Sequence, residues 1–401
     1  MLSNRLAMLP HHALVVALGV GLVAVPMRAQ ETLVGAFEQG QARVEFRTRF
    51  EHVDDAAFVP PATHKTANAF TNRTLLGYVT GPFHDLSVSL EFLGVSVIGT
   101  ERYNDGTNNL TRYATVTDPP QNVFNQAFLA FRGLKVGRQS ISVDNQRFIG
   151  PGAWSQTPKT FNGAVFQNDT WLPCTDLMLG HLTQFHSSTG IDQKIRGDFA
   201  RFRISPAKAI HVTPFWYGFD QSLSPATSVQ HQGLRVDGKA WEWFIFEATY
   251  AQQRAYGHST ATPNRQYHCS MLGLTGFGLT LKGVDEELEG GFTTPYSALH
   301  SYYGDSDRIS ATPPQGLVDR YVQAEYKWRD TTFEAQFHRF SAHEGGQPFG
   351  REWDIRSHRP FGQHLSVFLE WAAYRADPTA PAALSLNKDL KKTWLMTTIR
   401  F

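Results

Sequence analysis

The sequence predicts an all-β protein: a closed, antiparallel transmembrane β-barrel of about eighteen strands, with sixteen as the alternative, in a bacterial outer membrane. Three observations predict it. The chain begins with a segment typical of secretion. The rest alternates apolar and polar residues over stretches of roughly 8–13 residues, and the connections between these stretches are alternately short and long. In QARVEFRTRFEH, residues 41–52, Ala42, Val44 and Phe46 alternate with charged residues.

Residues 1–29 are predicted to be a signal peptide. Arg5 precedes an apolar run at 13–25, ALVVALGVGLVAV, and Pro26 ends that run. A basic start followed by an apolar core of this length is the pattern of a secretory leader, and the run is short for a helix that crosses a bilayer. We expect cleavage after Ala29 and a single barrel domain over residues 30–401.

Composition excludes several other classes of protein. Of the 401 residues, 41% are hydrophobic, so the chain is not disordered, and 37 basic against 36 acidic residues give a net charge of only +1, which does not indicate nucleic-acid binding. The only cysteines, Cys174 and Cys269, do not make a disulfide framework or a metal motif. Neither GxSxG nor HExxH occurs, so we expect no enzyme and no cofactor.

The connections indicate how the barrel is oriented. Short turns such as GPFHD, DGKA and WRDT alternate with long connections such as 52–70 and 290–317. A barrel with both termini on the periplasmic side has tight turns at that rim and longer loops outside. Aromatic residues near the predicted strand ends are expected to form interfacial girdles; they are Trp171, Trp216, Tyr217, Trp241, Trp328 and Trp394.

The polar face of such a barrel lines a lumen wide enough for an aqueous channel. Alternation places these arginines on that face: Arg43, Arg47, Arg49, Arg201, Arg203 and Arg356, with Arg73 and Arg138. Val136 has the same parity as Arg138, and a bulge near Gly137 would turn Arg138 inward. Arginine rings favour anions, because guanidinium binds carboxylate in a bidentate manner. Acids such as Glu45 and Glu51 share the face, so the arginines either select an anionic solute or only pair with these acids.

Two stretches resemble the alginate-export family of outer-membrane porins: VGRQSISVDNQRFIGPGAWSQTPKTFNGAVF at 136–166, and the stretch from GVDEELEGG to LVDRYV at 283–322. The resemblance implies an eighteen-stranded barrel with an electropositive constriction that passes a polyuronate, with long loops or turns as gates. It implies that Arg49, Arg73, Arg138 and Arg147 face the path. The residues that it places in loops at the outer mouth are Trp154, Gln156, Phe292, Thr294, Pro295 and His300.

Two channel functions are therefore expected. One is passive export of an anionic polysaccharide, an alginate-like polyuronate, which slides between weak arginine sites. The other is a diffusion porin for small anionic or sugar-derived solutes. The expected partners are outer-membrane lipid, the barrel-assembly machinery and, for export, a periplasmic export scaffold. The barrel is expected to be a monomer.

An acidic run precedes the longest connection. The run consists of Asp285, Glu286, Glu287 and Glu289, and it could form a calcium site together with Asp305 and Asp307, because carboxylate oxygens are the ligands that Ca²⁺ prefers. The other interpretation of the run is a solvated rim that faces outward. The sequence leaves both interpretations open.

Overall fold

The computed structural model describes residues 32–57, 63–221, 224–260 and 264–401, so the predicted signal peptide at 1–29 lies outside the described residues. The described residues form one sheet of eighteen antiparallel strands. The strands are β1 Gln41–Asp55, β2 Thr66–Val79, β3 Leu86–Val97, β4 Gln121–Phe131, β5 Leu134–Gln139, β6 Thr160–Asn168, β7 Thr175–His186, β8 Asp192–Ala207, β9 Ile210–Asp220, β10 Val229–Ala240, β11 Phe244–Ala255, β12 Arg265–Gly276, β13 Leu279–Leu288, β14 Leu317–Trp328, β15 Thr331–Ser341, β16 Pro348–Phe361, β17 Leu365–Ala376 and β18 Leu390–Arg400.

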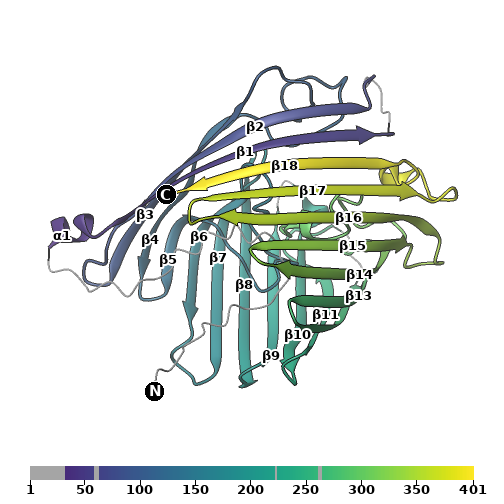
Figure 1. Cartoon of the computed structure of the whole chain (residues 1–401). Helices are drawn as coiled ribbons and strands as arrows, with labels where there is room; N and C mark the ends of the chain where they lie inside the picture. Colours follow the sequence, from purple (N-terminus) through teal and green to yellow (C-terminus); the bar gives the residue numbers. More distant parts are fainter. Residues whose placement is uncertain (1–31, 58–62, 222–223, 261–263) are drawn as a thin grey trace.

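The sheet closes on itself because β1 pairs with β18 (Figure 1). The pairing extends from Glu45 opposite Arg400 to Asp55 opposite Leu390. Closure removes the free strand edges, whose unsatisfied backbone groups would each cost several kcal/mol in hydrocarbon. The predicted fold class, with eighteen strands rather than sixteen, is confirmed.

Helical structure is scarce. A short helix, α1 Leu33–Glu38, precedes β1 and was not predicted; Thr32 caps it by accepting a 3.1 Å hydrogen bond from the backbone of Gly35. Three 3₁₀ turns are η1 Pro225–Thr227, η2 Leu299–Ser301 and η3 Ala383–Ser385. None of the helices in the described part of the chain is long and apolar enough to cross a membrane.

The connections alternate in length largely as predicted. At the end where β1 begins and β18 ends, tight turns such as 132–133, 277–278 and 329–330 join the strands (Figure 1). The opposite end carries the long connections, of which 98–120, 140–159 and 289–316 are the longest. We call the two ends the short-turn rim and the long-loop rim. The connections that follow β7 and β15 are short exceptions at the long-loop rim.

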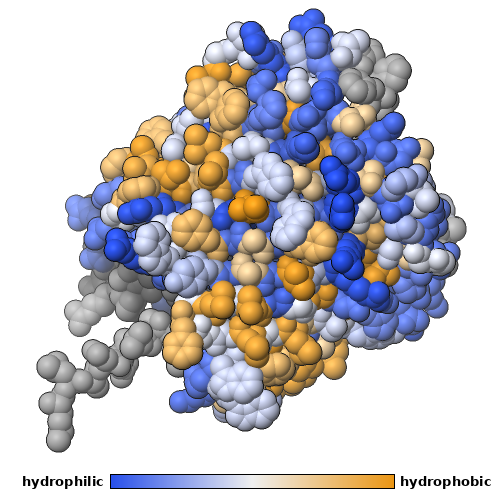
Figure 2. Space-filling view, turned by 45° about the vertical axis from the view of Figure 1, so that its right-hand side comes forward, coloured by the Kyte–Doolittle hydropathy of each residue, from blue (hydrophilic) through white to orange (hydrophobic). Residues whose placement is uncertain are grey.

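Each strand presents alternate residues outward and inward. Large hydrophobic side chains such as Leu90, Val322 and Ile355 are exposed on the outer wall, and Figure 2 shows hydrophobic residues gathered there beside hydrophilic ones. Trp171, Trp241 and Trp328 are exposed near the short-turn rim, as an interfacial girdle requires. Two predicted girdle residues are in the interior instead: Tyr217 lies in the aromatic core and Trp394 packs against Trp154.

The tight turns at the short-turn rim make a matched pair for a stability test. Gly133 and Gly362 both have positive φ, +86° and +65°. A Cβ at Gly133 would lie 2.3 Å from the Gln167 carbonyl oxygen, whereas a Cβ at Gly362 has no heavy atom within 4 Å. Gly362→Ala should lower the free energy of unfolding by only roughly 1–2 kcal/mol, which is the cost of placing an alanine in a left-handed backbone conformation. Gly133→Ala should lower the stability clearly more, because the new methyl group would collide with the Gln167 carbonyl; thermal unfolding in detergent measures both variants. Equal losses of stability would contradict the close contact at Gly133.

Candidate functional site

The inward arginines other than Arg47 form ion pairs with acids of the barrel interior. Glu45 is fully buried and forms ion pairs with three arginines, at 3.0 Å from Arg43 and 2.8 Å from Arg400, with Arg73 as the third. On the other side of the barrel Arg201 contacts Asp144 at 2.8 Å and Asp176 at 2.5 Å, and Arg203 lies 3.7 Å from Asp237. Of the two roles that the sequence left open, the structure provides direct evidence for pairing.

The connection at 140–159 folds into the lumen, and Arg47 holds it there. The Arg47 guanidinium donates to the Gln156 side chain at 2.9 Å and to the carbonyls of Ala153, Trp154 and Ser155 at 2.5–3.1 Å. Its side chain is completely buried. Arg47 therefore acts as a clamp on what we call the first lumen loop, residues 140–159, instead of facing open water.

Arg49 joins three separate segments. Its guanidinium donates to the Trp154 carbonyl at 2.7 Å, forms an ion pair with Asp118 from the 98–120 connection, and lies 5.3 Å from the centre of the Trp154 ring. Asp118 in turn accepts a 2.8 Å hydrogen bond from the backbone of Gln156. These contacts fix the first lumen loop against β1.

A second lumen loop, residues 289–316, packs against the first. Gly150 donates to the Tyr296 carbonyl at 2.9 Å, and Lys159 Nζ donates to the Ser297 carbonyl at 2.7 Å. Burial lowers the pKa of Lys159 to about 8. Arg147 binds Glu286 at 2.7 Å and Thr294 at 3.1 Å. The resemblance placed Arg147 in the path, but it is buried among the rings of Tyr267, Tyr302 and Tyr303.

Aromatic side chains from both loops fill the lumen beside β9–β12. Phe148 packs against Phe215, Tyr217, Tyr267 and Phe292, with ring centroids 5.2–6.4 Å apart. Phe292, expected at the outer mouth, is fully buried in this core, as is Gln156 beneath the first loop. The wide aqueous lumen expected from the strand number is therefore largely occupied by protein.

A cavity of about 450 Å³ remains on the opposite side, beside β1, β17 and β18. It is lined by cations and carboxylates together. The cations are Arg49, Lys159, Arg308, Arg356 and Lys392, and the carboxylates are Glu51, Asp55, Asp118, Asp307 and Glu370. The lining is thus mixed in charge, not simply electropositive.

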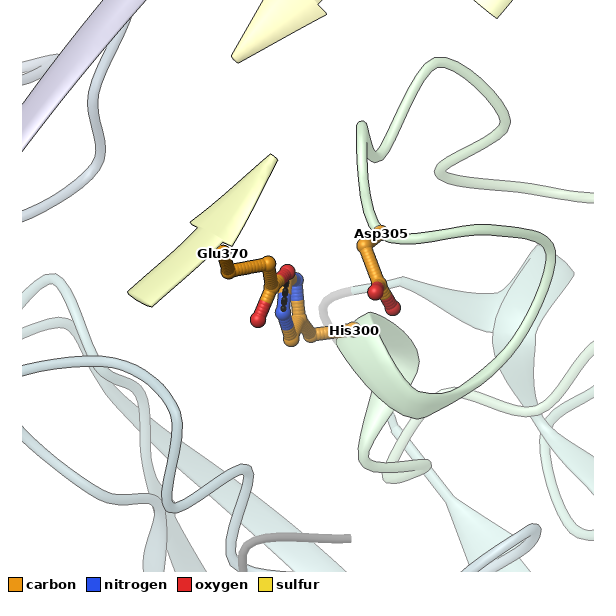
Figure 3. Close-up of side chains that lie close together, drawn as sticks. All are labelled: His300, Asp305 and Glu370. Carbon is orange, nitrogen blue, oxygen red and sulfur yellow. Dashed lines mark ion pairs between the residues drawn. The ribbon is translucent and has the colours of Figure 1, made fainter. Parts of the chain in front are cut away.

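His300 belongs to this lining and points toward Glu370 of β17 (Figure 3). Its ring stacks on Trp154 at 4.1 Å, its Nδ1 lies 3.2 Å from Asp307, and its Nε2 lies 3.4 Å from Glu370. Burial alone would lower the pKa of His300, but the two carboxylates raise it to about 10. His300 is therefore a further cation of the cavity wall at neutral pH, beside Arg356 and Lys392.

The neighbouring aspartates are already bound by cations. Ligand atoms of His300, Asp305 and Glu370 lie within 4.8 Å of one another, which is close enough for a metal ion (Figure 3). However, Arg356 donates to both Asp305 oxygens, and Lys392 binds Asp307 at 2.9 Å. The expected calcium site at Asp305 and Asp307 is therefore not favoured by the contacts.

The acidic run before the second lumen loop divides between the two faces. Glu286 faces inward to Arg147, while Asp285 and Glu287 both pair with the exposed Arg320 at 3.2 Å. The outward-facing interpretation of the run therefore describes Asp285 and Glu287.

Arg138 does not face the lumen. The pairing of β5 is continuous through Gly137, with Val136 opposite Leu129 and Arg138 opposite Ala127, so the predicted bulge is absent there. Arg138 therefore shares the outward face with Val136. It binds His186 at 2.7 Å and the Phe124 carbonyl at 2.8 Å.

Sequence reasoning missed three cations of the cavity: Lys159 and Arg308, which lie in the lumen loops, and Lys392 of β18. Arg308 lies in the second lumen loop and pairs with Asp55, and no alternation exists there to reveal it. Lys392 had a usable signal: Leu395, Thr397 and Ile399 share the outward face of β18, so Lys392 has the inward parity of Trp394.

Comparison with known proteins places the fold. No family model matches the chain, and no curated protein matches it. Solved structures from Pseudomonas aeruginosa do match. OccK9 (OpdG) has 13% identity and a TM-score of 0.69 over 92% of this chain and 100% of that one. OccD3 (OpdP) has 11% identity and a TM-score of 0.68, and the match covers 94% of each chain. OpdQ has 14% identity and a TM-score of 0.67, and the match covers 92% of this chain and 99% of that one.

The chain has an outer-membrane porin fold. At these identities the likeness shows the fold alone, so the resemblance to alginate-export proteins is supported only to the level of an eighteen-stranded porin barrel. The apolar outer wall and the closed sheet place the protein in a bacterial outer membrane. Both cysteines are free.

Arg47→Met tests the clamp. The variant loses four donated hydrogen bonds to the first lumen loop, each worth about 1.5–3 kcal/mol for a charged donor. We expect higher and noisier single-channel conductance in planar bilayers, because the loop no longer stays against β1. Arg43→Met is the matched control, since Arg43 is inward on the same strand and its guanidinium binds Glu45 and Glu91. Identical conductance in wild type and Arg47→Met would contradict the clamp.

His300→Gln tests the imidazolium at the cavity wall. Because the pKa of His300 is raised in the folded state, its stabilisation is fully present below a pH of about 6.5 and is lost as the pH rises through about 10. The unfolding temperature of the variant should therefore fall below that of wild type at neutral pH. The difference in unfolding temperature between the variant and wild type should disappear near a pH of about 10. His364→Gln at the short-turn rim is the control. A difference in unfolding temperature that does not depend on pH, or an equally large difference for His364→Gln, would refute the assignment of His300 as a cation.

Proposed function

We propose that the protein is a passive diffusion channel for small polar solutes, among them monomeric sugar acids and other sugar-derived compounds. The observation that carries this proposal is the cavity that the two lumen loops leave open. Its volume of about 450 Å³ suits a single small molecule, since ligand pockets of roughly 300–1,000 Å³ enclose drug-sized compounds.

The charge arrangement also favours small solutes over a polymer. A polyanion that slides from site to site needs a file of cations whose positive charge is not already neutralised. Here Arg49 pairs with Asp118, Arg356 with Asp305 and Lys392 with Asp307. A small solute needs only one exchangeable contact at a time, and mixed charges can bind both its hydroxyl and its carboxylate groups.

Export of an alginate-like polyuronate is the second candidate. The number of inward arginines and the resemblance of residues 136–166 and 283–322 favour it. For a polymer to pass, both lumen loops would have to leave the lumen, breaking the contacts of Arg47 and Arg147.

Permeation separates the two candidates. In liposome-swelling assays, glucose and monomeric glucuronate should enter proteoliposomes, whereas a long polyuronate should neither enter nor block the current in planar bilayers. Block by the polymer at concentrations where the monomer has no effect would favour export and count against the proposal.

Ion selectivity tests the cavity wall with two substitutions of opposite sign. Lys392→Met removes a cation of the lining, so the reversal potential should shift toward cation preference. Asp307→Asn removes its partner carboxylate and should shift the potential toward anion preference. The two variants serve as controls for each other, because a shift in the same direction for both would show that the cavity is not the permeation path.

A further inference from the structure

Four arginines form a row on the outer wall near the long-loop rim. Arg320 of β14 lies opposite Arg339 of β15, Arg339 lies opposite Arg351 of β16, and Arg351 lies opposite Arg375 of β17. All four are exposed. With neighbouring strands about 4.8 Å apart, this arginine row spans roughly 14 Å of the wall.

The row is short of compensating charge. Like charges directly opposite on neighbouring strands destabilise a sheet. Arg320 is paired, with Asp285 and Glu287. Among the residues that the structure describes, no ion pair involves Arg339, Arg351 or Arg375, although Arg339 lies over the ring of Phe337 at 5.6 Å. Three adjacent guanidiniums therefore present their donors to the surroundings of the barrel.

The row lies where the apolar wall ends. The next residues on the same face toward the short-turn rim, about 7 Å away, are Val322, Phe337 and Trp353, and they lie opposite one another. Beyond the row come the connections of the long-loop rim. In an outer membrane this level is the boundary between the hydrocarbon of the outer leaflet and its headgroups.

An apolar groove begins directly beneath the row. It has a volume of about 470 Å³, and small residues on β13–β15 form its floor. The floor contains Gly283, Ala324 and Ala335, and the walls contain Leu272, Phe337 and Trp353. The groove faces hydrocarbon, so only an acyl chain or another apolar group can fill it there.

We propose that the arginine row and the groove form one binding site for a phosphorylated glycolipid of the outer leaflet. The phosphate accepts hydrogen bonds from Arg339, Arg351 and Arg375, because the planar guanidinium matches phosphate oxygens in a bidentate manner. An acyl chain of the same molecule lies in the groove. The lipid thus supplies the negative charge that the row lacks, and its chain covers the gap left by the small residues.

Titration of the full-length mature chain with bisphosphorylated lipid A, read by native mass spectrometry in a neutral detergent, tests the site. Arg339→Gln, Arg351→Gln and Arg375→Gln combined should weaken binding at least about tenfold, since three charge-assisted contacts are lost. The matched control combines Lys208→Gln, Arg329→Gln and Arg359→Gln, which removes the same charge at the short-turn rim. Its affinity should equal that of wild type. Undiminished binding by the first variant, or equal loss in both, would overturn the site.

Two further arms distinguish a lipid from free phosphate. Lipid A without phosphates should bind weakly, and inorganic phosphate should not displace the intact lipid; failure of either expectation overturns the proposal. Gly283→Leu fills the groove, and it should fold because a Cβ there meets no heavy atom within 4 Å. It should weaken lipid A binding while leaving the arginine row intact. Unchanged binding by this variant would overturn the assignment of the acyl chain to the groove.

Discussion

The pairing of β1 with β18 is the constraint on which the rest of the structure depends. In hydrocarbon every backbone donor and acceptor must be satisfied within the protein, and only a closed sheet does this with strands. Closure fixes which residues face lipid and which face the lumen. The charged residues of β1 from Arg43 to Glu51 then lie inside, where Arg47, Arg49 and Glu45 need partners because burial leaves them little water.

The partners come from the lumen loops as much as from the wall. Arg47 donates to backbone carbonyls of the first loop, Arg49 binds Trp154 and Asp118, and Arg147 binds Glu286 and the second loop. The inward folding of the two lumen loops therefore both buries these charges and narrows the channel. The arginines that the sequence suggested as a path for anions act mainly as anchors, and solutes are left with a mixed-charge cavity beside β17 and β18.

Alternation was enough to predict the barrel, its strand number and the inward face of β1, because a period of two is imposed by the pleat itself. It could not predict the loops. The first lumen loop begins after Gln139, and Phe148 and Phe292 lie in connections with no periodic pattern. Apolar residues in a connection expected to lie outside the membrane were the available signal for an inward fold. The orientation of Arg138 depended on a bulge that pairing across β4–β6 shows to be absent at Gly137.

The central claim is that folded loops, and not the wall of eighteen strands, set the size of the channel. Exclusion of neutral polyethylene glycols from the open channel, measured as their effect on conductance in planar bilayers, tests it most directly. The account predicts that only the smallest glycols, comparable to a monosaccharide, enter and reduce the current. Entry of glycols much larger than a sugar would show a lumen open to the barrel wall and would contradict the account.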